Sequence, residues 1–129
     1  MNLLVTKEIN GEIICYGFSV GAYLLMELAT LREIDKMVLV SPSPFFADLV
    51  DTYAEEDKKH MYVKNMKKTL HEMCNMIKCK KIEVYTGEKE ADFMKEVAKK
   101  IADEFGVQLN IMKGMGHDKK LFEKVLSIK

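Results

Sequence analysis

The chain has 129 residues, of which 48% are hydrophobic, and this predicts one domain, residues 1–129, with a single core. Its 20 basic and 20 acidic residues cancel, which argues against bulk attraction to nucleic acid or to an anionic membrane surface. No apolar stretch approaches the roughly 20 residues of a membrane span. No secretory signal opens the chain, so we expect a cytoplasmic protein.

The first predicted element is a β-hairpin. Residues 3–9 are strand-like, Asn10-Gly11 is a strong two-residue hairpin turn, and residues 12–16 form an apolar second strand. An unpaired strand edge needs cover, and the hairpin would supply it. The alternative is that residues 3–9 are the remnant of a helix and that a second chain seals the edge.

A serine in a glycine-bounded turn follows that second strand. Gly17-Phe18-Ser19-Val20-Gly21 is a G-x-S-x-G placed before an apolar-rich helix over residues 22–31. The two glycines let strand and helix approach closely around a strained turn, which exposes the serine hydroxyl at its apex. The helix directs its unpaired N-terminal amides at Ser19, and the Val20 N–H is the predicted oxyanion donor.

Strands and helices alternate through the rest of the chain, which predicts an α/β fold. Ser41-Pro42-Ser43-Pro44 stops one strand, and residues 45–79 are longer than a crossover needs, which favours a helical lid insertion. The other expected elements are strands at residues 36–40, 81–85 and 107–112 and helices at residues 94–105 and 121–126. We expect a parallel sheet of about four strands with helices on both faces, extended by the N-terminal antiparallel strand.

The cysteines do not predict a structural cross-link. Cys15, Cys74 and Cys79 are odd in number and lack paired C-x-x-C spacing, which argues against a disulfide framework and against a zinc site. We expect reduced thiols, and neither a metal nor an organic cofactor.

A histidine and a carboxylate follow the later strands. His117 comes after the last predicted strand, whose carboxyl end shares a sheet edge with Ser19. A serine hydroxyl attacks an acyl carbon at neutral pH only when a neighbouring imidazole takes its proton, and a carboxylate fixes the imidazole tautomer. Glu90 is the predicted carboxylate, and Asp92 is the alternative acid.

The order of these motifs resembles the α/β-hydrolase superfamily over nearly the whole chain. In that family the serine of G-x-S-x-G is followed by an acid after the next-but-one strand and by a histidine after the last strand. The acid loop of the family typically reads Gly-x-x-Asp, and Glu90 falls on that aspartate position. The resemblance implies a catalytic triad of Ser19, Glu90 and His117.

The chain departs from the family ahead of the nucleophile. Members usually carry several strands there, and the loop after one of them donates the second oxyanion N–H. Few residues precede Ser19 here, and no HGGG-like segment occurs. The hairpin register puts Leu4 near Gly17 and so brings Met1 and Asn2 beside the nucleophile, where a backbone N–H could replace the missing donor.

Together these features predict a serine hydrolase that cleaves carboxylic esters or thioesters through an acyl-enzyme intermediate. Its substrate would be a small acyl ester or thioester, because better leaving groups tolerate an incomplete oxyanion hole. The alternative is a catalytically weak or inactive hydrolase-like fold that binds an acyl ligand or a protein partner. One form of such binding is a homodimer through the sheet edge.

Overall fold

The computed structural model describes residues 2–49 and 68–128. In chain order the elements are β1 (Leu4–Ile9), β2 (Glu12–Phe18), α1 (Val20–Leu31), β3 (Ile34–Val40), α3 (Leu70–Met76), β4 (Cys79–Gly87), α4 (Asp92–Phe105), β5 (Leu109–Met112) and α5 (Lys119–Leu126). The five strands form one sheet in the order β1-β2-β3-β4-β5, so each strand pairs with its neighbour along the chain.

The sheet is mixed, with one antiparallel pair at its edge. β1 pairs antiparallel with β2, and Leu4 faces Gly17 as the Asn10-Gly11 turn predicts. The remaining pairs, β2 with β3, β3 with β4 and β4 with β5, are all parallel. The predicted α/β fold with an antiparallel N-terminal strand is therefore confirmed, and the helix-remnant alternative for residues 3–9 is wrong.

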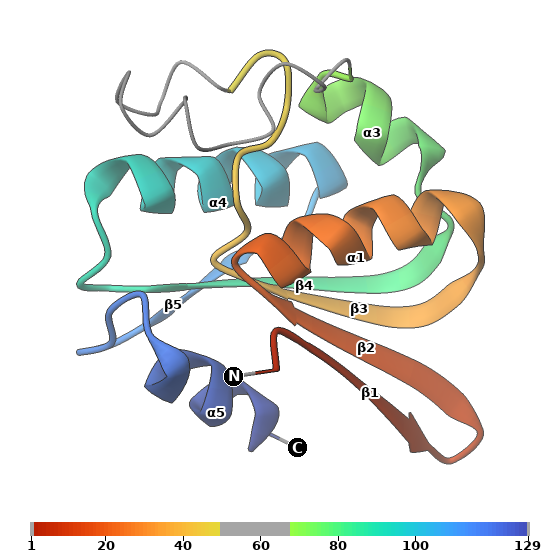
Figure 1. Ribbon diagram of the computed structural model, residues 1–129, viewed down its shortest axis with the longest axis horizontal. Helices are drawn as coiled ribbons and strands as arrows, with labels where there is room; N and C mark the ends of the chain where they lie inside the picture. The colour runs from red at the N-terminus through yellow and green to blue at the C-terminus, as the bar shows by residue number, and fades with distance from the viewer. Residues whose placement is uncertain (1, 50–67, 129) are drawn as a thin grey trace.

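Helices cover both faces of the sheet, as Figure 1 shows. α1, α3 and α4 lie on one face, where Leu25, Met37 and Ile101 belong to the larger core cluster. α5 lies on the other face, where Leu121 and Phe122 pack with Phe18 of β2. The amphipathic stripes of α4 and α5 are thus core-facing, as their helical spacing predicts.

β2, β3 and β4 are longer than predicted because pairing extends beyond the apolar runs, whereas β5, predicted at residues 107–112, begins only at Leu109. β4 was expected at residues 81–85 but occupies Cys79–Gly87, since Cys79 pairs with Ile34 of β3 and Gly87 pairs with Met112 of β5. Lys80 and Lys81 near its start are polar and exposed, so the hydrophobic pattern alone underestimates its length.

The insertion predicted at residues 45–79 lies in part outside the described residues, which resume at residue 68. Within its described part, α3 begins at a capping box in which Thr69 and Glu72 exchange side-chain and backbone hydrogen bonds. Leu70 and Met73 are buried in the same core as Phe46. These residues of α3 therefore contribute to the core rather than standing apart from it.

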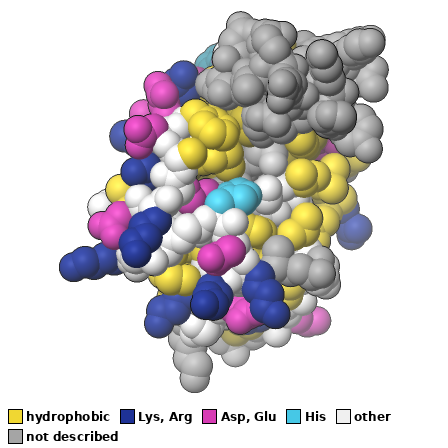
Figure 2. Space-filling view, turned by 60° about the vertical axis from the view of Figure 1, so that its left-hand side comes forward, with side chains coloured by type: hydrophobic (Ala, Val, Ile, Leu, Met, Phe, Trp, Pro, Cys, Tyr) yellow, Lys and Arg dark blue, Asp and Glu magenta, His cyan; other side chains and the backbone are white. Residues whose placement is uncertain are grey.

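No helix in the described ranges has the length and apolar character needed to cross a bilayer. On the face drawn in Figure 2, basic and acidic side chains are interspersed among the described residues. The three cysteines are free thiols, and Cys15 is buried.

Candidate active site

Ser19 stands at a sharp bend between β2 and α1. Its backbone has φ 56° and ψ −119°, a sparsely populated region for a residue other than glycine. The Ser19 N–H donates to the Val40 carbonyl of β3 at 3.0 Å, and the Ser19 carbonyl accepts from Ala22 N–H at 3.1 Å. The bend is therefore held from both sides, with its side chain at the carboxyl edge of the sheet.

The two glycines of the motif are required by close approach. A Cβ on Gly17 would lie 2.6 Å from the Gly21 carbonyl oxygen, and a Cβ on Gly21 would lie 2.2 Å from the Leu3 carbonyl oxygen. Both distances are far inside van der Waals contact. The first contact joins β2 to α1 as the motif predicts, whereas the second brings the segment before β1 against the helix start.

His117 reaches Ser19 from the other end of the chain. Its Nε2 lies 3.1 Å from Ser19 Oγ, and its ring lies against that of Phe18, with centroids 4.9 Å apart. The loop that carries it packs tightly on β4, because a Cβ on Gly87 would lie 2.3 Å from the Met115 carbonyl oxygen. The bend and this loop place the two side chains in contact at 98 residues of separation.

Glu90 holds the second ring nitrogen of His117. Glu90 Oε1 lies 2.6 Å from His117 Nδ1, and the carboxylate is buried, with the residue only 5% exposed. Its other oxygen, Oε2, accepts from Thr86 Oγ1 at 2.9 Å, from Gly87 N–H at 2.6 Å and from the Ser41 hydroxyl. We call the hydrogen-bonded series Ser19–His117–Glu90 the relay.

The environment keeps Glu90 ionised. Burial acts to raise the pKa of its carboxyl, but the hydrogen bonds from His117, Ser41, Gly87 and Thr86 outweigh burial and hold the pKa below its ordinary value. An acceptor-only carboxylate requires His117 to donate from Nδ1. In the neutral imidazole, Nε2 is then the acceptor that faces the Ser19 hydroxyl.

Asp92, the alternative acid, lies elsewhere. It is the first residue of α4, its side chain is fully exposed, and its carboxylate is 3.6 Å from Lys95 Nζ. The geometry therefore favours Glu90 as the partner of His117.

The N–H of Val20 is the oxyanion donor that the sequence motif predicts. Val20 is the first residue of α1, and its N–H has no acceptor among the described residues. The segment before β1 approaches the bend through the Leu3 carbonyl, which accepts from Phe18 N–H at 2.9 Å. Asn2 is exposed, and Met1, the other predicted source of a second donor, lies outside the described residues.

Two serines beside the relay are missed by the sequence motifs. Ser41 and Ser43 are buried, and they contact Glu90 and Ser19 respectively. The sequence shows Ser41-Pro42-Ser43-Pro44 only as a strand stop. Their position after the strand next to the nucleophile strand is the signal that could have located them, because parallel strands end at one sheet edge.

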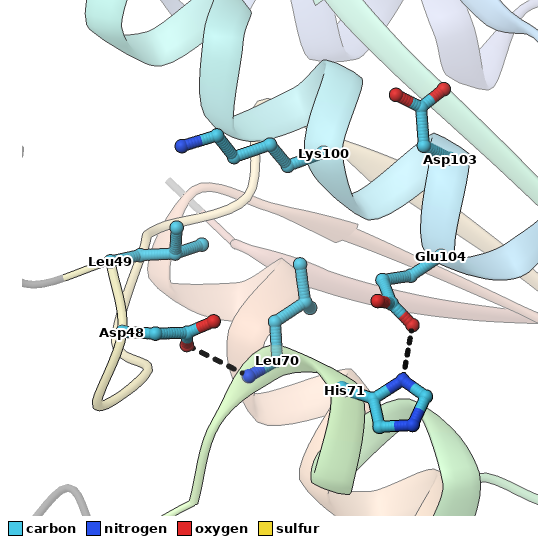
Figure 3. Close-up of a pocket in the computed structure, with 7 residues that line it drawn as sticks. All are labelled: Asp48, Leu49, Leu70, His71, Lys100, Asp103 and Glu104. Atoms are coloured by element: carbon cyan, nitrogen blue, oxygen red, sulfur yellow. Dashed lines mark hydrogen bonds and ion pairs between the residues drawn. The ribbon is translucent and has the colours of Figure 1, made fainter.

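A second titratable cluster lies between α3 and α4. Figure 3 shows a pocket of about 480 Å³ in which His71 faces Glu104, with 2.9 Å between His71 Nδ1 and Glu104 Oε2. It is also lined by Asp48, Leu49, Leu70, Lys100 and Asp103. Among the described residues, the lining includes no serine or cysteine nucleophile. No group of three or more His, Cys, Asp or Glu side chains in the described ranges could hold a metal ion.

No protein-family model matches the chain, and no curated protein matches it. Among solved structures, the chain is similar to a Mycobacterium tuberculosis puromycin-hydrolyzing peptidase, with a TM-score of 0.58 and 8% sequence identity over 86% of this chain. The matched region is only 19% of that peptidase chain. At this identity the likeness is one of fold, which suggests a hydrolase-like α/β fold for this chain.

Proposed function

We propose that this protein is a serine hydrolase of the α/β-hydrolase type that cleaves carboxylic esters or thioesters. The observation that carries the proposal is the relay, with 3.1 Å from Ser19 Oγ to His117 Nε2 and 2.6 Å from His117 Nδ1 to Glu90 Oε1. Both distances are within the reach that proton transfer and tautomer fixation require.

The relay supports acyl transfer in two steps, acylation of Ser19 and hydrolysis of the acyl-enzyme. Ser19 Oγ attacks the acyl carbon while its proton passes to His117 Nε2, and the imidazolium is stabilised by the ionised Glu90. His117 then returns the proton to the leaving alcohol or thiol, which departs as the acyl-enzyme ester forms. A water molecule gives a proton to His117 and attacks this ester, and His117 then returns that proton to Ser19 Oγ as the carboxylic acid is released.

The oxyanion site supports esters and thioesters over amides. Val20 N–H lies at the start of α1, where the helix dipole favours negative charge. Loss of one oxyanion donor costs on the order of 100-fold to 1,000-fold in rate, so a site with one assigned donor suits substrates with good leaving groups.

Labelling by a fluorophosphonate probe tests the proposal directly. We expect the native protein to be labelled and Ser19→Ala and His117→Ala to lose labelling, because the probe reacts with an activated serine. His71→Ala is the matched control, since His71 pairs with Glu104 in the pocket between α3 and α4 and its loss should leave labelling unchanged. Equal labelling of the native protein and Ser19→Ala would overturn the proposal.

A second candidate function is association of this chain with a second copy of itself, and two features of the sheet edge favour it. Among the described residues, β1 pairs with β2 alone, and α1 beside it exposes Leu24, Leu28 and Leu31 at helical spacing. Pairing of β1 with β1 of another copy would extend the sheet and cover this stripe. Sedimentation equilibrium tests this interface. A native protein that has the mass of a monomer, with the same mass in Leu28→Lys, would rule the interface out.

A further inference from the structure

The tetrapeptide Ser41-Pro42-Ser43-Pro44, here the 41–44 segment, lies directly after β3 and is wholly buried. Each proline fixes its own φ and has no N–H to donate, so the segment is stiff. Ser41 is fully buried, and Ser43 is 4% exposed. Buried hydroxyls require hydrogen-bond partners, and both of these serines find theirs in the relay.

Ser41 is anchored to the acid of the relay. Its hydroxyl donates to Glu90 Oε2, and its N–H donates to the Tyr85 carbonyl of β4 at 2.8 Å. Its φ of 44° lies in the left-handed region, which a residue other than glycine adopts only when its surroundings enforce it. Glycine would adopt this φ without strain, but it would lack the hydroxyl that donates to Glu90.

Ser43 is anchored to the nucleophile. Its N–H donates to the Ser19 carbonyl at 3.2 Å, and its Oγ lies 3.5 Å from Ser19 Oγ. Ser19 Oγ is the side-chain partner of the Ser43 hydroxyl among the described residues. The separation is long for a hydroxyl pair, as contacts at reacting groups often are before substrate binds.

The direction of each hydrogen bond follows from Glu90. Because the carboxylate only accepts, a neutral His117 donates from Nδ1 and accepts at Nε2 from the Ser19 hydroxyl. Ser19 Oγ then has lone pairs left, and the Ser43 hydroxyl is the donor placed to reach them. The hydrogen-bonded series thus begins at Ser43 and ends at Ser41, two residues apart in one stiff segment.

We propose that Ser41 and Ser43 are positioning residues, and that the 41–44 segment acts as a clamp that sets the acid and the nucleophile on opposite sides of His117. This inference rests on the proposed function. It adds two residues, Ser41 and Ser43, that lie outside the motifs from which the relay was predicted. Ser43 orients the Ser19 hydroxyl toward Nε2. Ser41 spreads the negative charge of Glu90, which limits how strongly the carboxylate stabilises the imidazolium.

The two serines predict different signatures in the rate of fluorophosphonate labelling as a function of pH. Ser43→Ala should slow labelling about tenfold at every pH, the effect of one lost hydrogen bond, without moving the acid limb of the profile. Ser41→Ala and Ser41→Gly should move the acid limb to higher pH by about half a pH unit, because a more concentrated carboxylate charge favours the imidazolium.

The charged groups next to Glu90 and His117 in the sequence are unchanged in these variants. Among the described residues, the charged groups that flank Glu90 and His117 in the sequence are Glu88, Lys89, Asp92 and Asp118, which are exposed, and Lys95, which is half-buried. Ser127→Ala is the matched control, since Ser127 is exposed and its hydroxyl donates to the Lys124 carbonyl. It should reproduce the native rate and profile.

Ser41→Gly keeps the test valid if Ser41→Ala fails to fold, because glycine adopts a φ of 44° without strain. A native rate in Ser43→Ala together with a native profile in Ser41→Gly would overturn the clamp, while loss of labelling in Ser19→Ala would leave the proposed function standing. Labelling that survives Ser19→Ala would instead overturn the proposed function itself.

Discussion

The substitution Glu90→Gln separates the charge of the relay acid from its shape. The amide has one oxygen and one NH₂ group, whereas the carboxylate accepts three donors at Oε2 and His117 at Oε1. If the amide oxygen takes the Oε2 position, the NH₂ group faces His117 Nδ1. The imidazole must then carry its proton on Nε2, where it cannot accept from Ser19.

The wrong tautomer should slow labelling by on the order of 1,000-fold to 10,000-fold. Stability should fall by about 1–3 kcal/mol at pH 7, because hydrogen bonds from Ser41, Thr86 and Gly87 lose charge assistance in a buried site. The pKa of Glu90 is lowered on folding, so its ionisation stabilises the native state above the unfolded pKa of about 4.3. That contribution disappears as pH falls through the lower folded pKa.

The rate of probe labelling measures the effect of Glu90→Gln on reactivity. Urea unfolding at pH 7 and at decreasing pH measures its effect on the free energy of unfolding. The stability difference between native protein and Glu90→Gln should narrow below about pH 4. Asp92→Asn is the control, since this exposed side chain pairs with Lys95. A labelling rate in Glu90→Gln within about threefold of native, with a large loss in Asp92→Asn, would refute the assignment of the acid.

Three further predictions concern stability and thiol reactivity. Gly21→Ala should lower the free energy of unfolding by roughly 1–3 kcal/mol, because its Cβ would lie 2.2 Å from a carbonyl oxygen. Gly116→Ala is the control in the same urea unfolding assay and should be near neutral, because a Cβ there meets nothing within 4 Å. Thr69→Ala removes the cap of α3 and should cost about 1 kcal/mol in the same assay with probe labelling unchanged; an unchanged midpoint contradicts the capping argument. Burial raises the pKa of Cys74 to about 12, so iodoacetamide at pH 8 should modify it more slowly in native protein than in urea; equal rates would contradict this.

The hairpin and the serine bend follow from sequence because both depend on local backbone geometry. Asn10 and Gly11 adopt the positive φ values that a two-residue turn requires, and the turn fixes the register that puts Leu4 opposite Gly17. Gly17 must lack a Cβ because the helix after Ser19 folds back onto its own strand. These contacts span few residues, so residue type and spacing suffice to predict them.

The choice of acid and the clamp depend on contacts between segments far apart in the chain. Glu90 and Asp92 are two residues apart, yet Glu90 turns inward to Ser41 and His117 while Asp92 begins α4 with an exposed side chain. Ser41 and Ser43 look like a strand stop until the parallel sheet brings the end of β3 between the nucleophile and the acid. Sequence by itself determined which groups can perform the chemistry, because side-chain type sets reactivity. The tertiary structure decided which of them meet, because a hydrogen bond requires positions accurate to a fraction of an ångström, which only the assembled sheet provides.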